Sequence, residues 1–229
     1  MLKSKYDVSH SDQEWRDFLL ANDFGQLIAT GRDREQPVVT PTHFIFDGQS
    51  IIELHVHRLN PVIQAIYERN SVLFSVIGAY VYIPTQWNVE AGTDPEWSIP
   101  TSYYAAVQAA GQATIVDDPG ELSGLLNRQM RHFQPEGGYH PVEPGMNPHG
   151  RMLGAICGVR ISIQGVEAKF KFGGNRMPAH RTRVAACLAA RGARGDAETL
   201  FHLVRREKPA SFCPEFVARP KPSSVKSTT

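Results

Sequence analysis

The sequence has few cysteines, and the three that it contains are far apart. Cys157, Cys187 and Cys213 are odd in number and form no CxxC pair. A zinc site or a disulfide framework is therefore not expected, and reduced thiols are the ordinary state of such residues. No stretch approaches the roughly 20 apolar residues that cross a bilayer, and residues 1–10 lack the apolar core of a signal peptide. We expect a cytoplasmic protein without a membrane partner.

An excess of charge of one sign is also missing. Lysine and arginine number 24, and aspartate and glutamate number 23, which gives a formal net charge of +1. No overall field then draws the chain to nucleic acids or to acidic membranes. This balance counts against a DNA-binding domain of the usual basic kind.

Several common catalytic and nucleotide-binding motifs do not occur. The sequence has no GxGxxG, GxxxxGK[ST], GxSxG or HExxH run. Rossmann and P-loop nucleotide sites, α/β-hydrolase catalysis and zinc peptidases are therefore not indicated. No metal-ligand set at a fixed spacing stands out, and these patterns leave the catalytic residues unknown.

The chain does contain enough apolar material for one core. It has 229 residues, of which 41% are hydrophobic, and this fits a single domain with helical additions. We place that domain at residues 1–207. Residues 208–229 are rich in proline, serine and lysine and lack apolar periodicity, so we expect a disordered tail.

Runs of β-branched and aromatic residues predict strands along most of the chain. The expected strands cover residues 26–30, 38–46, 51–56, 71–77, 79–83, 101–116, 158–164 and 166–172. The first three form an antiparallel meander with an Asp-Gly turn at residues 47–48, and Gly111 marks either a bulge or a tight barrel corner. Helices are expected at residues 11–22 with Ser11 as the cap, at 60–68, at 119–131 with Asp117 or Asp118 as the cap, and at 178–190 and 197–205. The absence of a βαβ rhythm favours a mainly β fold with α (α+β), a barrel with flanking helices.

The most informative stretch is residues 54–61 (LHVHRLNP), which ends a strand and opens a helix. Strand alternation puts His55 and His57 on one face, and Arg58 follows at the strand end. Asn60 is a good N-cap. A helix N-terminus beside an arginine can hold an anion, because free amides and a guanidinium point at the same place. The phosphate of a planar cofactor such as FMN fits this pattern; alternatively, Asn60 only starts a helix and Arg58 is solvated.

The two histidines allow a second interpretation. Either His55 or His57 can ligate a heme iron, or can act as an acid or a base near neutral pH. Histidines two residues apart on a strand also occur as plain surface residues or as hydrogen-bonded core residues. A heme role therefore stays open beside the flavin hypothesis.

Residues 99–107 bring hydroxyl groups to the start of a long strand. The hydroxyls of Thr101 and Tyr103 can hydrogen-bond a cofactor phosphate or a ring edge, and Tyr80 can stack on a flat ring. The ordinary alternative is that aromatic residues simply fill a barrel core.

A basic segment near residue 170 carries the last candidates. Lys169 and Lys171 share one strand face, and Asn175 and Arg176 follow a Gly-Gly turn. These side chains can lie beside a cofactor phosphate, whereas lysines on a strand more commonly protect an exposed edge.

Four segments, in the same order, resemble the PaiB family of FMN-binding negative transcriptional regulators. Residues 55–61 (HVHRLNP) resemble the HxARxNP segment of that family. Residues 78–85 (GAYVYIPT) resemble its GPHAYISPS, residues 100–107 (PTSYYAAV) its PTWNYAAVH, and residues 169–176 (KFKFGGNR) its KWKLSQNR. The resemblance covers roughly residues 5–190.

The resemblance implies an FMN-binding split β-barrel of the pyridoxamine-phosphate-oxidase type with flanking helices. It also implies a homodimer with cofactor sites between the subunits. The candidate cofactor-binding residues are His55, His57, Arg58, Asn60, Tyr80, Thr101, Tyr103, Lys169, Lys171, Asn175 and Arg176. The family label implies a transcriptional repressor and hence DNA as a partner, although the sequence shows no helix-turn-helix and no basic stripe.

The sequence departs from the family pattern at two places. Ser102-Tyr103 replaces Trp-Asn, and Gly173-Gly174 replaces Ser-Gln. Some relatives bind heme b through a histidine at the position of His55 and form the nitrogen–nitrogen bond of piperazate, so a heme enzyme is the alternative. An FMN-dependent oxidoreductase and a cofactor-free dimeric module are further hypotheses. Whether the protein is an enzyme therefore stays open.

Overall fold

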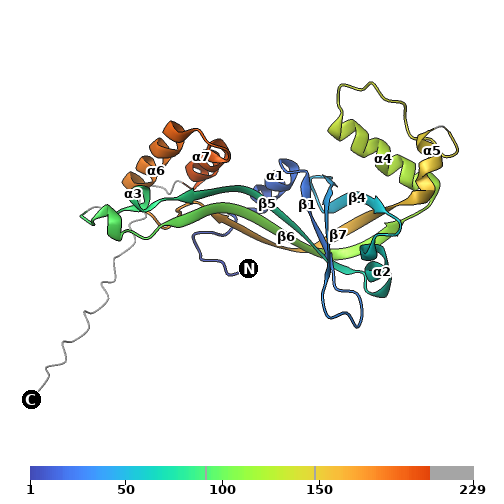
Figure 1. Cartoon of the computed structure of the whole chain (residues 1–229), viewed down its shortest axis with the longest axis horizontal. Helices are drawn as coiled ribbons and strands as arrows, with labels where there is room; N and C mark the ends of the chain where they lie inside the picture. Colours follow the sequence, from blue (N-terminus) through green and yellow to red (C-terminus); the bar gives the residue numbers. More distant parts are fainter. Residues whose placement is uncertain (91, 147, 207–229) are drawn as a thin grey trace, which may run out of the picture.

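The computed structural model describes residues 1–90, 92–146 and 148–206, and seven strands in these residues form one antiparallel sheet (Figure 1). The strands are β1 (Phe24–Ala29), β2 (Val38–His43), β3 (Ile45–Phe46), β4 (Ile51–His57), β5 (Ser71–Ile83), β6 (Thr101–Val116) and β7 (Ile156–Lys171). The helices are α1 (Asp12–Leu20), α2 (Pro61–Glu68), α3 (Thr85–Asn88), α4 (Pro119–Phe133), α5 (His149–Met152), α6 (Pro178–Arg191) and α7 (Asp196–Arg205), with short 3-10 turns η1 (Pro95–Trp97) and η2 (Leu153–Ala155). None of the described helices combines the length and apolarity that a bilayer crossing needs. The predicted α+β class is confirmed, and the tail predicted at 208–229 lies outside the described residues.

The order of the strands shows that the sheet closes into a barrel. From edge to edge the order is β2-β1-β5-β6-β7-β4-β3, yet only Phe44 separates β2 from β3 in the sequence. The two edges must therefore meet, which requires the sheet to roll up. Phe44 is 1% exposed and packs against Phe74, with ring centroids 4.8 Å apart. The predicted antiparallel pairings are confirmed, since β1 pairs with β2 and β3 pairs with β4, but the strand predicted at 38–46 is divided at Phe44 into β2 and β3, which lie at opposite edges of the sheet.

Three strands continue beyond the barrel as an extension. In Figure 1, β5, β6 and β7 run as long curved ribbons from the barrel to α6 and α7. The breaks predicted near residues 78 and 165 are irregularities within single strands, at register shifts between Ile77 and Tyr80 and opposite Gly111. The predicted bulge at Gly111 is confirmed. A Cβ at Gly111 would lie 2.3 Å from the carbonyl oxygen of Ser162, so only glycine fits there.

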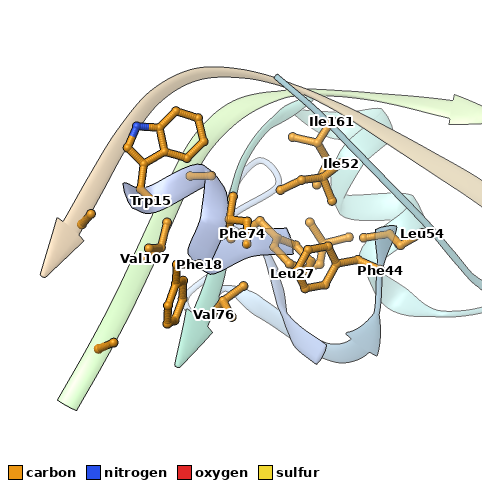
Figure 2. Packing of buried hydrophobic residues seen from close by; sticks show 14 of the residues in the cluster. Trp15, Phe18, Leu27, Phe44, Ile52, Leu54, Phe74, Val76, Val107 and Ile161 are labelled. Atoms are coloured by element: carbon orange, nitrogen blue, oxygen red, sulfur yellow. The ribbon is translucent and has the colours of Figure 1, made fainter. Parts of the chain in front are cut away.

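The main core fills the space between the barrel wall and α1 (Figure 2) and continues under α6 and α7. Trp15, Phe18 and Leu19 form the buried stripe of α1 that the sequence predicts. The ring of Phe18 meets that of Phe170 edge-on, with centroids 5.6 Å apart. Burial of side chains of this size stabilises the fold by about 1.5–3 kcal/mol each. The barrel and α1 therefore form one packed unit.

The helix starts follow the predicted caps with one exception. Oδ1 of Asp118 accepts hydrogen bonds from the first free amides of α4, at 3.0 and 2.9 Å. Oδ1 of Asn60 accepts from the amide of Val62 in α2, at 3.0 Å. Ser11 makes no side-chain cap bond, so its predicted capping role is wrong. The carboxylate of Glu14 instead accepts from a backbone amide that precedes α1, at 2.6 Å.

The two C-terminal helices cover the outer end of the extension and tie it to the barrel. Nε of Arg191, the last residue of α6, donates to Asp196 at the start of α7 at 2.9 Å. Arg206 directly follows α7, is 2% exposed, and donates to Glu14 of α1 at 2.6 Å. This buried ion pair joins α7 to the helix that covers the barrel core.

Candidate functional site

The predicted cofactor residues lie in two groups, one at each end of the long strands. His55 pairs with Gly158 near the start of β7, whereas Lys171 ends β7 opposite Tyr104. The stretch of β7 from 158 to 171 has a length of about 40 Å at the usual rise of a strand. A flavin mononucleotide is much shorter than this stretch. A single chain therefore does not bring the two groups to one cofactor.

Arg58 is held by main-chain carbonyls rather than by the start of α2. Its Nε donates to the carbonyl of Gly154 at 3.0 Å, and its Nη2 donates to that of Ile156 at 3.1 Å. Its backbone amide donates to the carbonyl of Ala155 at 2.8 Å. The side chain thus fastens the end of β4 to the start of β7. Within the described residues Nη1 makes no hydrogen bond, so its two N–H groups are left for an anion.

The start of α2 offers fewer free donors than the sequence indicates. The cap on Val62 uses one amide, and Pro61 has no amide hydrogen. Nδ1 of the exposed His57 accepts from the amide of Leu59 at 3.1 Å. The predicted cap at Asn60 is confirmed. The expected convergence of a guanidinium and free amides on one anion is not formed, because the guanidinium is bound elsewhere.

His55 lines an open cleft between β4 and the helices α4 and α5. The cleft has a volume of about 370 Å³ and a mainly apolar wall. Figure 1 shows α4 and α5 over this end of the sheet, beside β4. The apolar wall is supplied by Leu126, Met130, Phe133, Val142, Met152 and Ile156. We name this space the α4 cleft.

A hydrogen bond and a ring contact hold His55 at the edge of the α4 cleft. Its Nδ1 lies 2.6 Å from Oε1 of Gln129, and its ring meets that of His43 edge-on, with centroids 5.0 Å apart. Burial, and then the neighbouring His55, lower the pKa of His43. The surroundings of His43 therefore favour its neutral form. Imidazoles beside an apolar cleft can exchange protons with a bound molecule or ligate a heme iron.

A buried carboxylate fixes α4 over this cleft. Glu53 of β4 accepts from Arg128 of α4 at 2.8 Å and from Arg160 of β7 at 3.0 Å. Glu53 is 7% exposed, and a charge in such a position requires close partners. Because Gln129 follows Arg128 in the chain, the same ion pairs position the side chain that binds His55.

At the far end of the extension, Lys171 and Thr101 form a polar pair. Nζ of Lys171 donates to Oγ1 of Thr101 at 2.9 Å. Lys169 instead donates to the carbonyl of Leu2 at 2.8 Å and lies 5.5 Å from the centre of the Tyr104 ring. Of the two predicted lysines, Lys171 is the one placed beside a hydroxyl that can share a phosphate oxygen.

Tyr80, Tyr104 and Lys171 form a row across the extension. Tyr80 pairs with Tyr104, and Tyr104 pairs with Lys171, so the three side chains project from the same face of β5, β6 and β7. Tyr80 is 59% exposed. Two further predicted residues lie just beyond β7, where Asn175 is exposed and Arg176 forms an ion pair with Glu90.

Tyr103 is a core residue, which removes it from the exposed face. It is 2% exposed, its ring lies 6.1 Å from that of Phe172, and burial raises its pKa. Within the described residues its hydroxyl has no hydrogen-bond partner. A Cβ at Gly173 would come within 2.3 Å of that hydroxyl oxygen. The tyrosine and the glycine, both departures from the PaiB pattern, therefore match each other in size.

Sequence reasoning proposed His55 as a candidate but missed its partners. His43 comes from another strand, and Gln129 lies 74 positions later in the chain. One signal existed for Gln129, which falls among the apolar residues of a predicted helix and is 3% exposed. A buried amide requires a hydrogen-bond partner, although the sequence does not say which.

Solved structures of other proteins have a similar fold. The conserved hypothetical protein Rv2991 from Mycobacterium tuberculosis is 18% identical, with a TM-score of 0.51 over 75% of this chain and 91% of that chain. The flavocytochrome Anf3 from Azotobacter vinelandii is 18% identical, with a TM-score of 0.53 over 69% of this chain and 67% of that chain. The FAD and heme binding protein from Mycobacterium smegmatis is 18% identical, with a TM-score of 0.53 over 73% and 74% of the two chains. At these identities the likenesses establish the fold alone.

The sequence itself places the chain in a family. No curated protein matches it. Residues 1–165 match the model of the family described as "Putative FMN-binding domain". The matched part runs from the N-terminus into β7 and includes His55, Arg58 and Thr101, but it ends before Lys171. The match confirms FMN as the predicted cofactor, and the chain belongs to this FMN-binding domain family.

Proposed function

We propose that the protein binds FMN between two copies of the chain. In this arrangement the barrel end of one subunit and the extension of the other form each site. The observation that carries the proposal is the division of the candidate residues into two groups separated by about 40 Å of strand. A symmetric dimer with its two subunits reversed relative to each other places one group of each kind at each site.

The exposed face of the extension supports a second copy as its partner. Ile77, Tyr80 and Tyr82 of β5 are 66%, 59% and 50% exposed. Contiguous aromatic surface of this kind is typical of interfaces and ligand sites. The same face offers tyrosine rings on which the flat isoalloxazine can stack.

The donors on the extension fit the phosphate of FMN. Lys171 and Thr101 already lie within hydrogen-bond distance of each other, so one phosphate oxygen can accept from both. On the barrel side, Nη1 of Arg58 remains as a donor. FMN, when bound, supplies the redox chemistry, and the protein supplies binding, orientation and charge.

The first test is direct. The purified protein, loaded with FMN, is expected to show the two absorption bands of a flavin, in the near ultraviolet and in the blue. Its mass in solution is expected to be that of two chains. A flavin-loaded monomer would contradict the shared site, and a chain that takes up no flavin would contradict the proposal as a whole. A single intense Soret band after purification would instead establish the heme alternative at His55.

The lysines offer a matched pair of variants. Lys171→Met is expected to weaken FMN binding by about 1.5–3 kcal/mol, because it removes a charged donor to the phosphate. Lys169→Met removes the same charge two residues away and is expected to leave the affinity unchanged. Flavin fluorescence titration measures both, and equal losses would show that Lys171 has no specific role.

Mixing of variants tests whether two chains share one site. Arg58→Gln removes the charge but keeps a donor for the carbonyls that Arg58 binds. When this variant and Lys171→Met are unfolded together and refolded, random pairing is expected to restore about one quarter of the intact sites. Recovery of no FMN binding from the mixture would indicate that each site is built within a single chain.

We extend the proposal to transcriptional regulation of the PaiB type on the resemblance of the four segments. A flavin-loaded dimer is then expected to shift a DNA fragment from upstream of its own gene, with a different affinity when FMN is removed. Rapid anaerobic bleaching of the flavin by NADH or NADPH, without any gel shift, would favour the FMN-dependent oxidoreductase instead.

A further inference from the structure

The tautomer of His55 is set by a chain of hydrogen bonds. Nε2 of Gln129 lies 3.5 Å from the backbone carbonyl of Glu53, which can only accept. The amide of Gln129 therefore turns its NH₂ group toward that carbonyl and its Oε1 toward Nδ1 of His55, at 2.6 Å. An amide oxygen also only accepts, so Nδ1 of His55 carries the proton.

The opposite nitrogen of the same ring is left as an acceptor. With the proton on Nδ1, Nε2 of His55 holds a lone pair. Within the described residues Nε2 has no hydrogen-bond partner, and the ring lines the α4 cleft. Among the described imidazoles of the cleft, which also include His43 and His149, His55 is the one whose acceptor nitrogen is fixed by a hydrogen bond.

The wall of the α4 cleft suits a flat apolar ring. Met130 and Met152 supply thioethers, which contact aromatic rings favourably, and Phe133 supplies an aromatic surface. The ring of His43 contacts both His55 and Phe133 edge-on, with centroids 5.0 and 5.1 Å apart, so the three rings support one another. Met152 is 62% exposed, which leaves the cleft open for entry.

The charge and the size of the α4 cleft narrow the choice of ligand. Among the described residues that line it there is no lysine, arginine, aspartate or glutamate, and a charged ligand would lose its hydration without gaining an ion pair. The volume of about 370 Å³ lies near the lower limit of ligand pockets. A small neutral molecule fits these limits better than a tetrapyrrole does.

We propose that the α4 cleft binds a small neutral aromatic molecule that carries one O–H or N–H group, and that this group donates to Nε2 of His55. Gln129 is a positioning residue in this site, since it acts on the ligand only through the tautomer of His55. The site is separate from the phosphate donors at Lys171 and Thr101, but His55 also belongs to the barrel-end group of the proposed flavin site, so competition with FMN is one outcome of the test.

Phenol and toluene are matched probes for this site. They have nearly the same shape, but only phenol can donate a hydrogen bond. Phenol is expected to bind about tenfold more tightly than toluene, in the range that one hydrogen bond to a buried acceptor gives. Titration of protein with ¹⁵N-labelled histidine is expected to show Nδ1 protonated in the free state and a shift of the Nε2 signal of His55 on addition of phenol.

Three variants test whether Gln129 and the α4 cleft are responsible for the preference for phenol. Gln129→Leu is expected to lower phenol affinity to that of toluene and to mix the two tautomers of His55, while toluene still binds. Gln134→Leu changes another glutamine of the same cleft, which donates to the carbonyl of Gly137 instead. It is expected to keep the preference for phenol. Leu126→Trp fills the cleft and is expected to abolish binding of both probes.

Several results would overturn the proposal. Equal affinities for phenol and toluene would show that Nε2 of His55 does not accept a hydrogen bond from the ligand. Phenol binding that survives Leu126→Trp would show that the ligand binds outside the α4 cleft. Displacement of phenol by hemin with a Soret band would assign the cleft to heme. Displacement of phenol by FMN would assign it to the flavin, so the titrations are run both with and without FMN.

Discussion

The barrel end and the extension differ in whether their buried polar groups have hydrogen-bond or ion-pair partners. At the barrel end, Glu53 is paired with two arginines, and Asn60 and Asp118 cap their helices. Among the described residues, the buried side-chain atoms without a hydrogen-bond partner gather at the extension. They include Oδ1 of Asn88, the hydroxyl of Tyr103, Oγ1 of Thr199 and Nδ1 of His202.

This difference predicts that the two ends have different stabilities. Each unpaired buried polar group destabilises its surroundings by about 1–3 kcal/mol. The main core continues from the barrel to the extension, where α6 and α7 cover it, but the extension also has an exposed aromatic face. The extension should therefore open before the barrel does, which is common for elements that meet a ligand or a partner.

The largest expected effect comes from breaking the joint between the two ends. Arg206→Met leaves Glu14, which is 3% exposed, as a buried and unpaired charge. We expect a loss of about 3–5 kcal/mol in the free energy of unfolding. Arg205→Met is the matched control, because Arg205 pairs with Asp17 on the surface at 3.3 Å, and it should change stability by less than about 1 kcal/mol. Urea unfolding at fixed protein concentration measures both.

The location of the damage is as informative as its size. In Arg206→Met, amide hydrogen exchange is expected to speed up in α6, α7 and the outer parts of β5 to β7 first. The amides of β4 and of the barrel part of β7 should stay protected. A uniform loss of protection would show that the barrel and the extension unfold as one unit.

Much of the fold could be predicted because its signals are local. The strand predicted at residues 101–116 has the bounds of β6, and the caps at Asn60 and Asp118 mark the starts of two predicted helices. The same local signals predicted strand ends at positions where the strand only bends and then continues. Gly78 resembles a turn, but it makes room for the ring of Phe18, since a Cβ there would lie 2.6 Å from that ring.

The candidate site could be predicted only in part, since its contacts are not local. The pattern around residue 58 correctly indicated a helix start with an arginine beside it. It could not show that the carbonyls of Gly154 and Ile156, almost 100 positions away, take two of the donors of Arg58. Likewise, nothing near His55 in the sequence points to Gln129, because barrel closure and the Glu53 ion pair bring α4 to that strand.

A smaller effect is expected from pH, again at the extension. His202 of α7 stacks on Phe172 with ring centroids 4.7 Å apart, and burial lowers its pKa to about 4 from the usual 6.5. The folded protein therefore takes up this proton less readily than the unfolded chain does. The contribution of His202 to the free energy of unfolding should be constant above about pH 6.5. It should fall by about 3 kcal/mol in all as the pH drops toward 4. His202→Phe keeps the stacking and should flatten this part of the pH profile in urea unfolding.

The smallest effect concerns the fit of Tyr103 against Gly173. Gly173→Ser introduces a Cβ 2.3 Å from the hydroxyl of Tyr103 and places a non-glycine residue at φ +66°. We expect a loss of about 1–3 kcal/mol from overpacking and backbone strain. Gly192→Ser is the control for the backbone alone, because Gly192 has φ +58° and a Cβ there would meet no atom within 4 Å. The difference between the two variants isolates the clash.

A double-mutant cycle then tests whether the clash is with the hydroxyl. Tyr103→Phe removes an oxygen that is buried without a partner, so by itself it should be neutral or slightly stabilising. In the Tyr103→Phe background, the Cβ that Gly173→Ser introduces lies 3.0 Å from the ring carbon Cζ, whereas in the presence of Tyr103 it lies 2.3 Å from the hydroxyl oxygen. The coupling free energy should be about 1 kcal/mol in favour of the double variant. Strict additivity would mean that the two departures from the PaiB pattern are independent. Gly173 would then be required for a reason other than the space that the Tyr103 side chain occupies.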